Sequence, residues 1–281
     1  MGIPSLDGVV IAVTGGGRGI GLAIARRLAA AGARVAIGDI DEALAQQAAM
    51  QVGGRGFALD VRERASFEAF LAAAEAALGP LTGLVNNAGI MLAGPFLDEP
   101  DALSDTQIDI NLRGVILGCK TALPRLLPRG GHIVNVASMA GRLAVPGLSV
   151  YCATKFAVVG LTESLREEFR DTGVGFSSVL PSKVTTELAA GTEAAARGVP
   201  TVSPEDVAEA VHDAFVHDLP EVAVPRYLGA VGPLQGVAPH WLLRGVRRVF
   251  GDRRVLEQID HVARAGYAQR IAALARPARN A

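Results

Sequence analysis

Short apolar runs alternate along the chain with longer stretches of helical periodicity. Runs rich in Val, Ile and Leu suit strands covered on both faces of a parallel sheet. They occupy positions 9–13, 34–39, 55–59, 84–89 (ending in a polar turn), 131–137, 174–180 and 222–224. The stretches between them predict helices over 22–31, 65–78, 103–127, 151–171 and 204–218. This alternation predicts an α/β fold: a doubly wound parallel sheet within three layers.

Residues 14–21 form a glycine-rich turn between the first predicted strand and the first predicted helix. Glycine stands at positions 15, 19 and 21, which gives the spacing G-x-x-x-G-x-G. Glycine lets the backbone approach a ligand closely, and a helix N-terminus presents free N–H groups and a positive dipole to phosphate. In this position, the turn predicts a nucleotide-binding site.

Asp39 ends the second predicted strand. In a dinucleotide-binding unit, a carboxylate at this place meets the ribose hydroxyls of NAD and repels the additional phosphate of NADP. Arg18 is the contrary signal, because a guanidinium inside the turn could reach that phosphate. We weigh the fixed carboxylate above the flexible arginine, so NAD is the predicted cofactor and NADP the alternative.

Other small or polar residues also stand where predicted strands end. Because ligands of doubly wound sheets bind outside the carboxyl ends of the strands, these residues are predicted to share one cleft. They are Gly15, Asp39, Asp60, Asn87, Ser138 and Pro181.

Tyr151 and Lys155 stand four apart on a predicted helix, so the phenol and the ammonium lie on the same face. A free phenol has a pKa of about 10 and is a poor base at neutral pH. A nearby cation favours the phenolate and lowers that pKa. Alone, this spacing is also typical of an amphipathic helix with a surface lysine; together with Ser138 it predicts an acid/base site.

Taken together, these residues resemble the short-chain dehydrogenase/reductase family in its single-domain form, which implies a Rossmann-type sheet. The matching motifs are Thr14-Gly15-x-x-x-Gly19-Ile20-Gly21, Asp60, Asn86-Asn87-Ala88-Gly89, Asn111, Ser138, Tyr151-x-x-x-Lys155 and Pro181-x-x-Val184-x-Thr186. One departure is Ser182, which stands where the family usually has glycine.

The resemblance implies a catalytic tetrad of Asn111, Ser138, Tyr151 and Lys155. Tyr151 would exchange a proton with the substrate oxygen, which Ser138 would orient. Lys155 would lower the pKa of Tyr151 and bind the nicotinamide ribose, and Asn111 would hold a water that relays protons. The implied cofactor-binding residues are Gly15, Arg18, Gly19, Ile20, Gly21, Asp39, Asp60, Val61, Asn87, Ala88, Gly89, Tyr151, Lys155, Pro181, Val184 and Thr186.

The loops expected to cover the reacting carbon, 90–93, 139–148 and 188–190, are apolar, with Arg142 and Lys183 as the cations nearby. Apolar walls favour a lipophilic alcohol or ketone as substrate. The leading hypothesis is an oxidoreductase that transfers hydride between NAD(H) and such a compound. The alternatives are an NADPH-dependent reductase of an oxoacyl or other carbonyl compound and, from another class, a non-catalytic nucleotide-binding regulator, against which the tetrad argues.

Composition excludes other classes of function. The 281 residues carry a net charge of −1, and the two cysteines are far apart, so neither nucleic acid nor a disulfide framework nor a metal site is expected. No signal peptide opens the chain, and no apolar run reaches about 18 residues. A cytoplasmic location is predicted. His132 falls at the wrong end of its strand for a Ser-His-Asp hydrolase.

We expect residues 1–224 to form the catalytic domain, with the cofactor and substrate sites together. Residues 225–281 are expected to form a helical C-terminal extension packed on the core or on a partner subunit. The family resemblance implies that the helices over 103–127 and 151–171 pair, giving a homodimer or homotetramer.

Within this extension, residues 241–254 place apolar side chains on one arc and Arg244, Arg247 and Arg248 on the opposite one. Packing on the protein, cover for a lipophilic substrate entrance and contact with an anionic membrane surface all stay open for this stretch.

Overall fold

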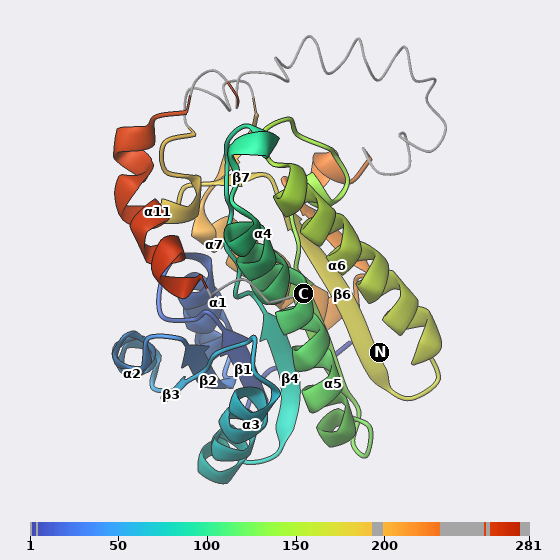
Figure 1. The fold of residues 1–281 in the computed structure, drawn as a ribbon. Coiled ribbons are helices and arrows are strands. Elements are labelled where there is room, and N and C mark those ends of the chain that lie inside the picture. Colours follow the sequence, from blue (N-terminus) through green and yellow to red (C-terminus); the bar gives the residue numbers. More distant parts are fainter. Residues whose placement is uncertain (1, 4, 193–198, 231–255, 257–258, 276–281) are drawn as a thin grey trace.

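Seven parallel strands form the central sheet of the computed structural model, which describes residues 2–3, 5–192, 199–230, 256 and 259–275 (Figure 1). Their order is β3-β2-β1-β4-β5-β6-β9, so the winding reverses between β1 and β4. Ligand clefts of such sheets lie at this reversal. The predicted doubly wound parallel sheet is confirmed. Its strands are β1 (Val10–Thr14), β2 (Arg34–Asp39), β3 (Arg55–Ala58), β4 (Leu81–Asn86), β5 (Gly131–Val136), β6 (Val174–Pro181) and β9 (Glu221–Val224).

Helices cover both faces of the sheet, which explains the apolar runs of its strands. Every residue of β5 and β6 is buried, as expected for parallel strands covered on both sides. One core contains Phe67, Phe70 and Phe176, and the other contains Ile24 and Phe215. The first core lies under α3 (Arg64–Leu78), α5 (Gly114–Leu126) and α6 (Ser149–Glu168), and the second under α1 (Gly19–Ala30), α2 (Glu42–Val52) and α7 (Pro204–His217).

Helix α1 begins inside the glycine turn, earlier than the predicted start at residue 22. Arg18 is its extended N-cap residue, and the Arg18 carbonyl accepts a hydrogen bond from the Leu22 N–H at 3.2 Å. The N–H groups of the first turn therefore lie next to Gly19 and Gly21, where the glycine pattern predicts a ligand.

The helix predicted over 103–127 is not a uniform α-helix. It consists of α4 (Asp101–Ile108), a π-helical turn η2 (Asp109–Arg113) and α5. Single π turns inside α-helices occur frequently at functional sites. Asn111 lies in this wide turn and is buried.

The sequence pattern did not give bounds for several elements, α2 among them. A short parallel pair, β7 (Lys183–Val184) and β8 (Thr201–Val202), follows the main sheet's sixth strand. A last helix, α11 (His261–Leu274), packs next to α4 and contributes Ile271 to the first core (red in Figure 1). Among the described helices, none is both long and apolar enough to span a membrane. The amphipathic stretch 241–254 lies outside the described residues.

Candidate active site

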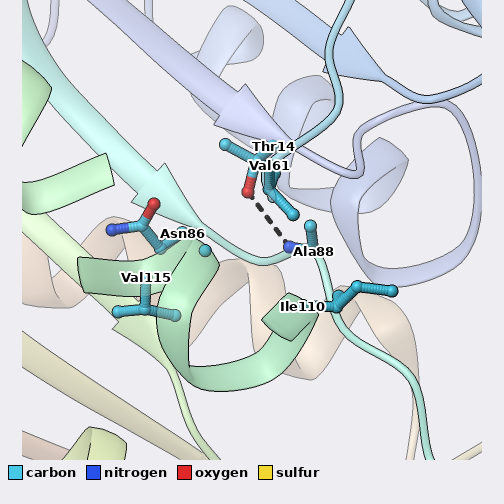
Figure 2. Close-up of a pocket in the computed structure, with 7 residues that line it drawn as sticks. Thr14, Val61, Asn86, Ala88, Ile110 and Val115 are labelled. Atoms are coloured by element: carbon cyan, nitrogen blue, oxygen red, sulfur yellow. Dashed lines mark hydrogen bonds between the residues drawn. The ribbon is translucent and has the colours of Figure 1, made fainter. Parts of the chain in front are cut away.

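The glycine turn is tied to the end of β4. The side-chain amide of Asn87 donates to the carbonyl oxygens of Thr14 and Gly15 at 2.9 and 3.1 Å. In return, the Thr14 hydroxyl oxygen accepts from the backbone N–H groups of Asn87 and Ala88, each at 3.0 Å (Figure 2 shows the second bond). These four bonds fix the turn at the point where the strand order reverses.

Only glycine fits at two positions of this turn. Gly15 has a φ of 62°, and a Cβ built on it would lie 2.9 Å from the Ala88 Cα. A Cβ on Gly21 would overlap the Gly15 carbonyl oxygen. The backbone behind the turn is therefore closely packed. The small pocket there, between Thr14, Ala88 and Ile110 (Figure 2), has no volume for a water molecule.

A much larger cleft, of about 680 Å³, opens in front of the turn. That volume lies within the range of small-molecule sites. Of the predicted cofactor residues, Pro181, Val184, Tyr151 and Lys155 do not belong to the described lining. The Pro181 carbonyl accepts a long bond from Ser138, and Val184 pairs with Val202. The predicted cofactor residues that line the cleft are Gly15, Arg18, Gly19, Ile20, Gly21, Asp39, Asp60, Val61, Asn87, Ala88, Gly89 and Thr186.

Asp39 holds a fixed carboxylate at one end of the cleft. One of its oxygens accepts from the Gly17 N–H at 3.0 Å and the other from the Asp41 N–H at 3.2 Å. Arg18 does not face Asp39, because its guanidinium lies 3.7 Å from the Glu187 carboxylate. The carboxylate is thus held by backbone groups, and within the described part of the chain no cation is bonded to it.

Asp60 has a partner that the sequence did not reveal. The guanidinium of Arg62 donates to both Asp60 oxygens, at 2.8 and 2.9 Å. A third bond, from Arg62 Nη1, reaches the Leu274 carbonyl oxygen at 2.7 Å. The charge of Asp60 is therefore largely neutralised where it lines the cleft.

Tyr151 and Lys155 occupy successive turns of α6, both buried. The Lys155 ammonium lies 5.7 Å from the centre of the Tyr151 ring and donates to the Val136 carbonyl oxygen at 2.9 Å. Ser138 follows β5, and its side chain forms a hydrogen bond with Tyr151. The structure therefore brings together three members of the predicted tetrad.

Asn111 lies beside them but bonds mainly to backbone. Its amide accepts from the Ile90 N–H and donates to the Ile90 carbonyl, both at 2.8 Å. It also donates to the Thr154 hydroxyl at 3.3 Å. A Cβ on Gly89 would stand 3.3 Å from the Asn111 Oδ1 atom and 3.7 Å from the Lys155 ammonium. Gly89 thus lies where the two side chains converge.

Burial dominates the protonation of the pair. It raises the pKa of Tyr151 above 10, and the hydrogen bond with Ser138 offsets this only in part. The net shift is upward, so burial outweighs any lowering by the neighbouring Lys155 in this structure. Burial also lowers the pKa of Lys155 to about 8. At neutral pH the phenol is protonated and most of the lysine is charged.

The wall next to Tyr151 is apolar. Met91, Ala140 and Cys152 form one buried cluster with Tyr151, and Leu188 packs against it. Arg142 is engaged by the carboxylates of Glu163 and Glu221, so it does not offer a free cation to a substrate. The departure at Ser182 is accommodated: its N–H donates to the Val224 carbonyl at 2.8 Å and its hydroxyl to the Pro200 carbonyl at 2.7 Å.

Thr186 has a hydroxyl that is buried without a hydrogen-bond partner among the described residues, and it lines the cleft. Such groups are rare in folded proteins unless a ligand or water completes them. Together with the glycine turn, this hydroxyl gives the cleft a polar group that a bound ligand could complete with a hydrogen bond.

Helix α11 forms part of the cleft wall, which sequence reasoning missed. Its residues Tyr267, Arg270, Ile271 and Leu274 line the cleft. The one sequence signal was Asp260, which caps the helix by accepting from the N–H groups of Val262 and Ala263. The helix carries alanine on several sides, so no apolar stripe marks a buried face.

A second polar cluster lies at the opposite end of the sheet. His132 is fully buried, and its Nε2 lies 2.8 Å from the Ser177 hydroxyl, while Nδ1 is 3.9 Å from the Asp218 carboxylate. Ser177 donates to the Leu219 carbonyl oxygen at 2.5 Å. Because the serine already donates elsewhere and the imidazole has no exposed surface, this cluster is not arranged as a hydrolase triad.

Comparison with known proteins gives a consistent result. A family model described as "short chain dehydrogenase" matches residues 9–197. 2-(S)-hydroxypropyl-CoM dehydrogenase 3 of Xanthobacter autotrophicus is 42% identical over 187 residues, which cover 64% of this chain and 73% of that protein. D-threitol dehydrogenase of Mycolicibacterium smegmatis is 41% identical over 189 residues, which cover 65% and 73% of the two chains.

A solved structure shares the fold. It is a short-chain dehydrogenase/reductase from Burkholderia phymatum in complex with NAD, with a TM-score of 0.75 and 27% sequence identity. The match covers 83% of this chain and 95% of that one.

Proposed function

Because the chain belongs to the short-chain dehydrogenase family, whose enzymes act on CH–OH groups, we propose that it transfers hydride between NAD(H) and a lipophilic alcohol or ketone. The observation that carries the proposal is the grouping of Ser138, Tyr151 and Lys155 beside an apolar wall. In this proposal Tyr151 is the general acid and base.

The cofactor is proposed to lie in the cleft of about 680 Å³. The glycine turn would hold its pyrophosphate, Asp39 its adenosine ribose and Thr186 its carboxamide. The fixed Asp39 carboxylate, to which no cation of the described residues is bonded, favours NAD over NADP. Bound NAD supplies the hydride acceptor, and NADH the hydride donor.

The protein's own residues carry out the proton transfer at the substrate oxygen. In reduction, protonated Tyr151 gives its phenolic proton to the carbonyl oxygen as that oxygen gains charge. The Ser138 hydroxyl donates a hydrogen bond to the same oxygen and stabilises the developing alkoxide. Asn111 holds the backbone of Ile90, and its Oδ1 atom and the Lys155 ammonium both lie close to Gly89.

Oxidation requires the phenolate, and here magnitudes matter. Lowering the pKa of a phenol from about 10 to about 7 takes roughly 4 kcal/mol of differential stabilisation of the phenolate. A full positive charge at a separation like that of Lys155, 5.7 Å from the ring centre, supplies about 3 kcal/mol at an effective dielectric constant of about 20. Burial of Tyr151 adds to the requirement. Lys155 alone therefore falls short, and further positive charge at the site is needed.

Two alternatives make different predictions. An NADPH-dependent reductase of an oxoacyl or other carbonyl compound would show a higher kcat/KM with NADPH than with NADH. A non-catalytic regulator would bind NADH without turnover of any alcohol. The buried Tyr151–Lys155 pair favours the enzyme, because a pure binding protein gains nothing from an ammonium held without a carboxylate.

We also propose a homodimer or homotetramer in the cytoplasm, with residues 1–224 as the catalytic domain and residues 225–281 as an extension. Peripheral membrane contact through 241–254 is one proposal for that extension. The helices expected at the subunit interface carry exposed apolar side chains, Ile108 on α4 and Phe156 on α6, each 41% exposed. Light scattering at micromolar concentration should give at least a dimer, and Phe156→Glu should shift it towards a monomer. A wild-type monomer would contradict this proposal.

The central experiment is Tyr151→Phe, because it removes the transferable proton but keeps the ring. Loss of general acid–base catalysis typically lowers turnover by about 10²–10⁴-fold, whereas NADH affinity should remain within about twofold. A screen of lipophilic alcohols followed by NADH absorbance finds the substrate for this assay.

Tyr227→Phe is the matched control, since Tyr227 lies in an exposed 3-10 turn (Arg226–Ala230) and is 68% exposed. Turnover by Tyr151→Phe within tenfold of wild type would remove Tyr151 from the mechanism.

A further inference from the structure

Helix α11 runs lengthwise along the cleft and contacts the segments that form it. Near its start, Arg264 donates to the carbonyl oxygens of Leu188, Ala190 and Met91, next to the apolar wall of Tyr151. At its end, the Leu274 carbonyl accepts from Arg62, which holds Asp60. The ten helical steps from Arg264 to Leu274 span about 15 Å. The helix thus extends from the reacting centre to the Asp60 end.

Arg270 lies midway along this path. Its Nη2 is 2.7 Å from an oxygen of Glu187, and the same oxygen is 3.7 Å from the Nη1 of Arg18. Arg18 belongs to the glycine turn, and all three side chains line the cleft. Arg270 is therefore brought to the turn from more than 200 residues away in the sequence.

The local charge favours an anion. Two guanidiniums share one carboxylate, which leaves one positive charge in excess among these three side chains. The N-terminus of α1 adds the positive end of its dipole. The side chains are 46–60% exposed, and ion pairs at such positions contribute only about 0–1 kcal/mol. Glu187 is therefore easily replaced by a phosphate, which a guanidinium can bind through two parallel hydrogen bonds.

We propose that Arg270 is a cofactor-binding residue that α11 places against the pyrophosphate, with Glu187 as the internal anion that it leaves when the dinucleotide binds. This inference rests on the proposed function, since it takes NAD(H) as the ligand of the cleft. The rival explanation is structural: Arg270 only ties the 3-10 turn Glu187–Ala189 to α11.

The two explanations differ in the effect of Glu187→Gln. If Arg270 binds phosphate, removing the competing carboxylate leaves NADH affinity unchanged or raises it, while Arg270→Gln lowers it about tenfold. If the ion pair only holds the turn, both substitutions break the same pair and both weaken binding. Arg270→Lys keeps the charge but lacks the parallel N–H donors of the guanidinium, so its NADH affinity should lie between those of Arg270→Gln and wild type.

The measurement is calorimetric titration of NADH at low and at high salt. Gln269→Glu is the matched control, because it changes the charge by the same amount one residue away, at an exposed position that does not line the cleft. We expect the NADH affinity of the control to stay within twofold of wild type. The affinity of Arg270→Gln should be about tenfold lower at low salt, and it should depend less on salt than that of wild type. Thermal unfolding of every variant should match wild type, since the pair is exposed.

An Arg270→Gln affinity within twofold of wild type overturns the inference, as does weakening by Glu187→Gln. Failure of the proposed function is distinguishable from this. If the wild-type protein binds neither NADH nor NADPH, the proposed function and the role of Arg270 are both wrong. If it binds NADH with the same affinity as Arg270→Gln, only the role of Arg270 is wrong.

Discussion

Replacing Lys155 with methionine should make the protein more stable and less active. Burial lowers the pKa of Lys155 from 10.5 to about 8, which corresponds to about 3 kcal/mol of folding free energy. The sign follows from proton binding: between pH 8 and pH 10.5 the unfolded chain holds more protons on this lysine than the folded protein. Stability therefore rises with pH through that window, and below pH 8 the full penalty of about 3 kcal/mol is present.

Methionine removes this penalty but leaves the Val136 carbonyl without the bond from Lys155. An unsatisfied buried carbonyl costs about 1–3 kcal/mol. Lys155→Met should therefore raise the unfolding free energy at pH 7 by up to about 2 kcal/mol. Turnover should be lost, because the variant lacks the cation that favours the Tyr151 phenolate.

Urea unfolding of wild type and variant at pH 7 and pH 9, without cofactor, is the assay. The difference in unfolding free energy between the two proteins should shrink by about 1 kcal/mol from pH 7 to pH 9. The reason is that burial of the charged Lys155 destabilises the wild type less as the pH rises. Other titrating groups are common to both proteins and cancel. A variant less stable than wild type at pH 7, or a difference independent of pH, would refute the idea that Lys155 is held at the expense of the fold.

Substitutions at two further positions, Asp39 and His132, test the charge arrangement and the pH dependence. Asp39→Ala should weaken NAD binding and improve kcat/KM with NADP by about tenfold, or roughly 1.4 kcal/mol. Asp39→Asn should give the same kcat/KM with NADP, while it retains an acceptor for the Gly17 N–H. A wild type that already prefers NADP would show that Asp39 has been misinterpreted. Burial lowers the pKa of His132 from 6.5 to about 4, so the unfolded chain binds the additional proton between these values and stability should fall by about 3 kcal/mol from pH 7 to pH 4. His132→Asn should remove that part of the pH dependence, and parallel curves for the two proteins would show that His132 does not titrate in this range.

The strands and the grouping of the tetrad were predictable because their signals are local. A buried parallel strand is a continuous apolar run, and the residue that follows it necessarily lies at the carboxyl edge of the sheet. Tyr151 and Lys155 share a face simply because they are four apart on a helix. The dinucleotide fold follows from such neighbours in sequence.

What could not be predicted leaves no periodic signal in the sequence. The π turn at Asn111 adds one residue to a helix without interrupting its pattern of apolar positions. Arg62 reaches Asp60 across a turn that has no periodicity. Helix α11 has no apolar stripe, and it is attached through the guanidinium of Arg264 to carbonyl oxygens, which are present in any sequence.

The long sequence separation of these contacts has a consequence for synthesis on the ribosome. A nascent chain that has emerged as far as Val224 already contains all seven strands of the main sheet, the glycine turn and the tetrad. It lacks the helix that joins Met91, Glu187 and Arg62, segments that precede that helix by up to 212 positions. Closing such distant contacts is slow relative to local ones. The growing polypeptide therefore contains every strand of the sheet and the tyrosine before one wall of its cleft exists, and until α11 is made the cleft lacks the cover that this helix gives it.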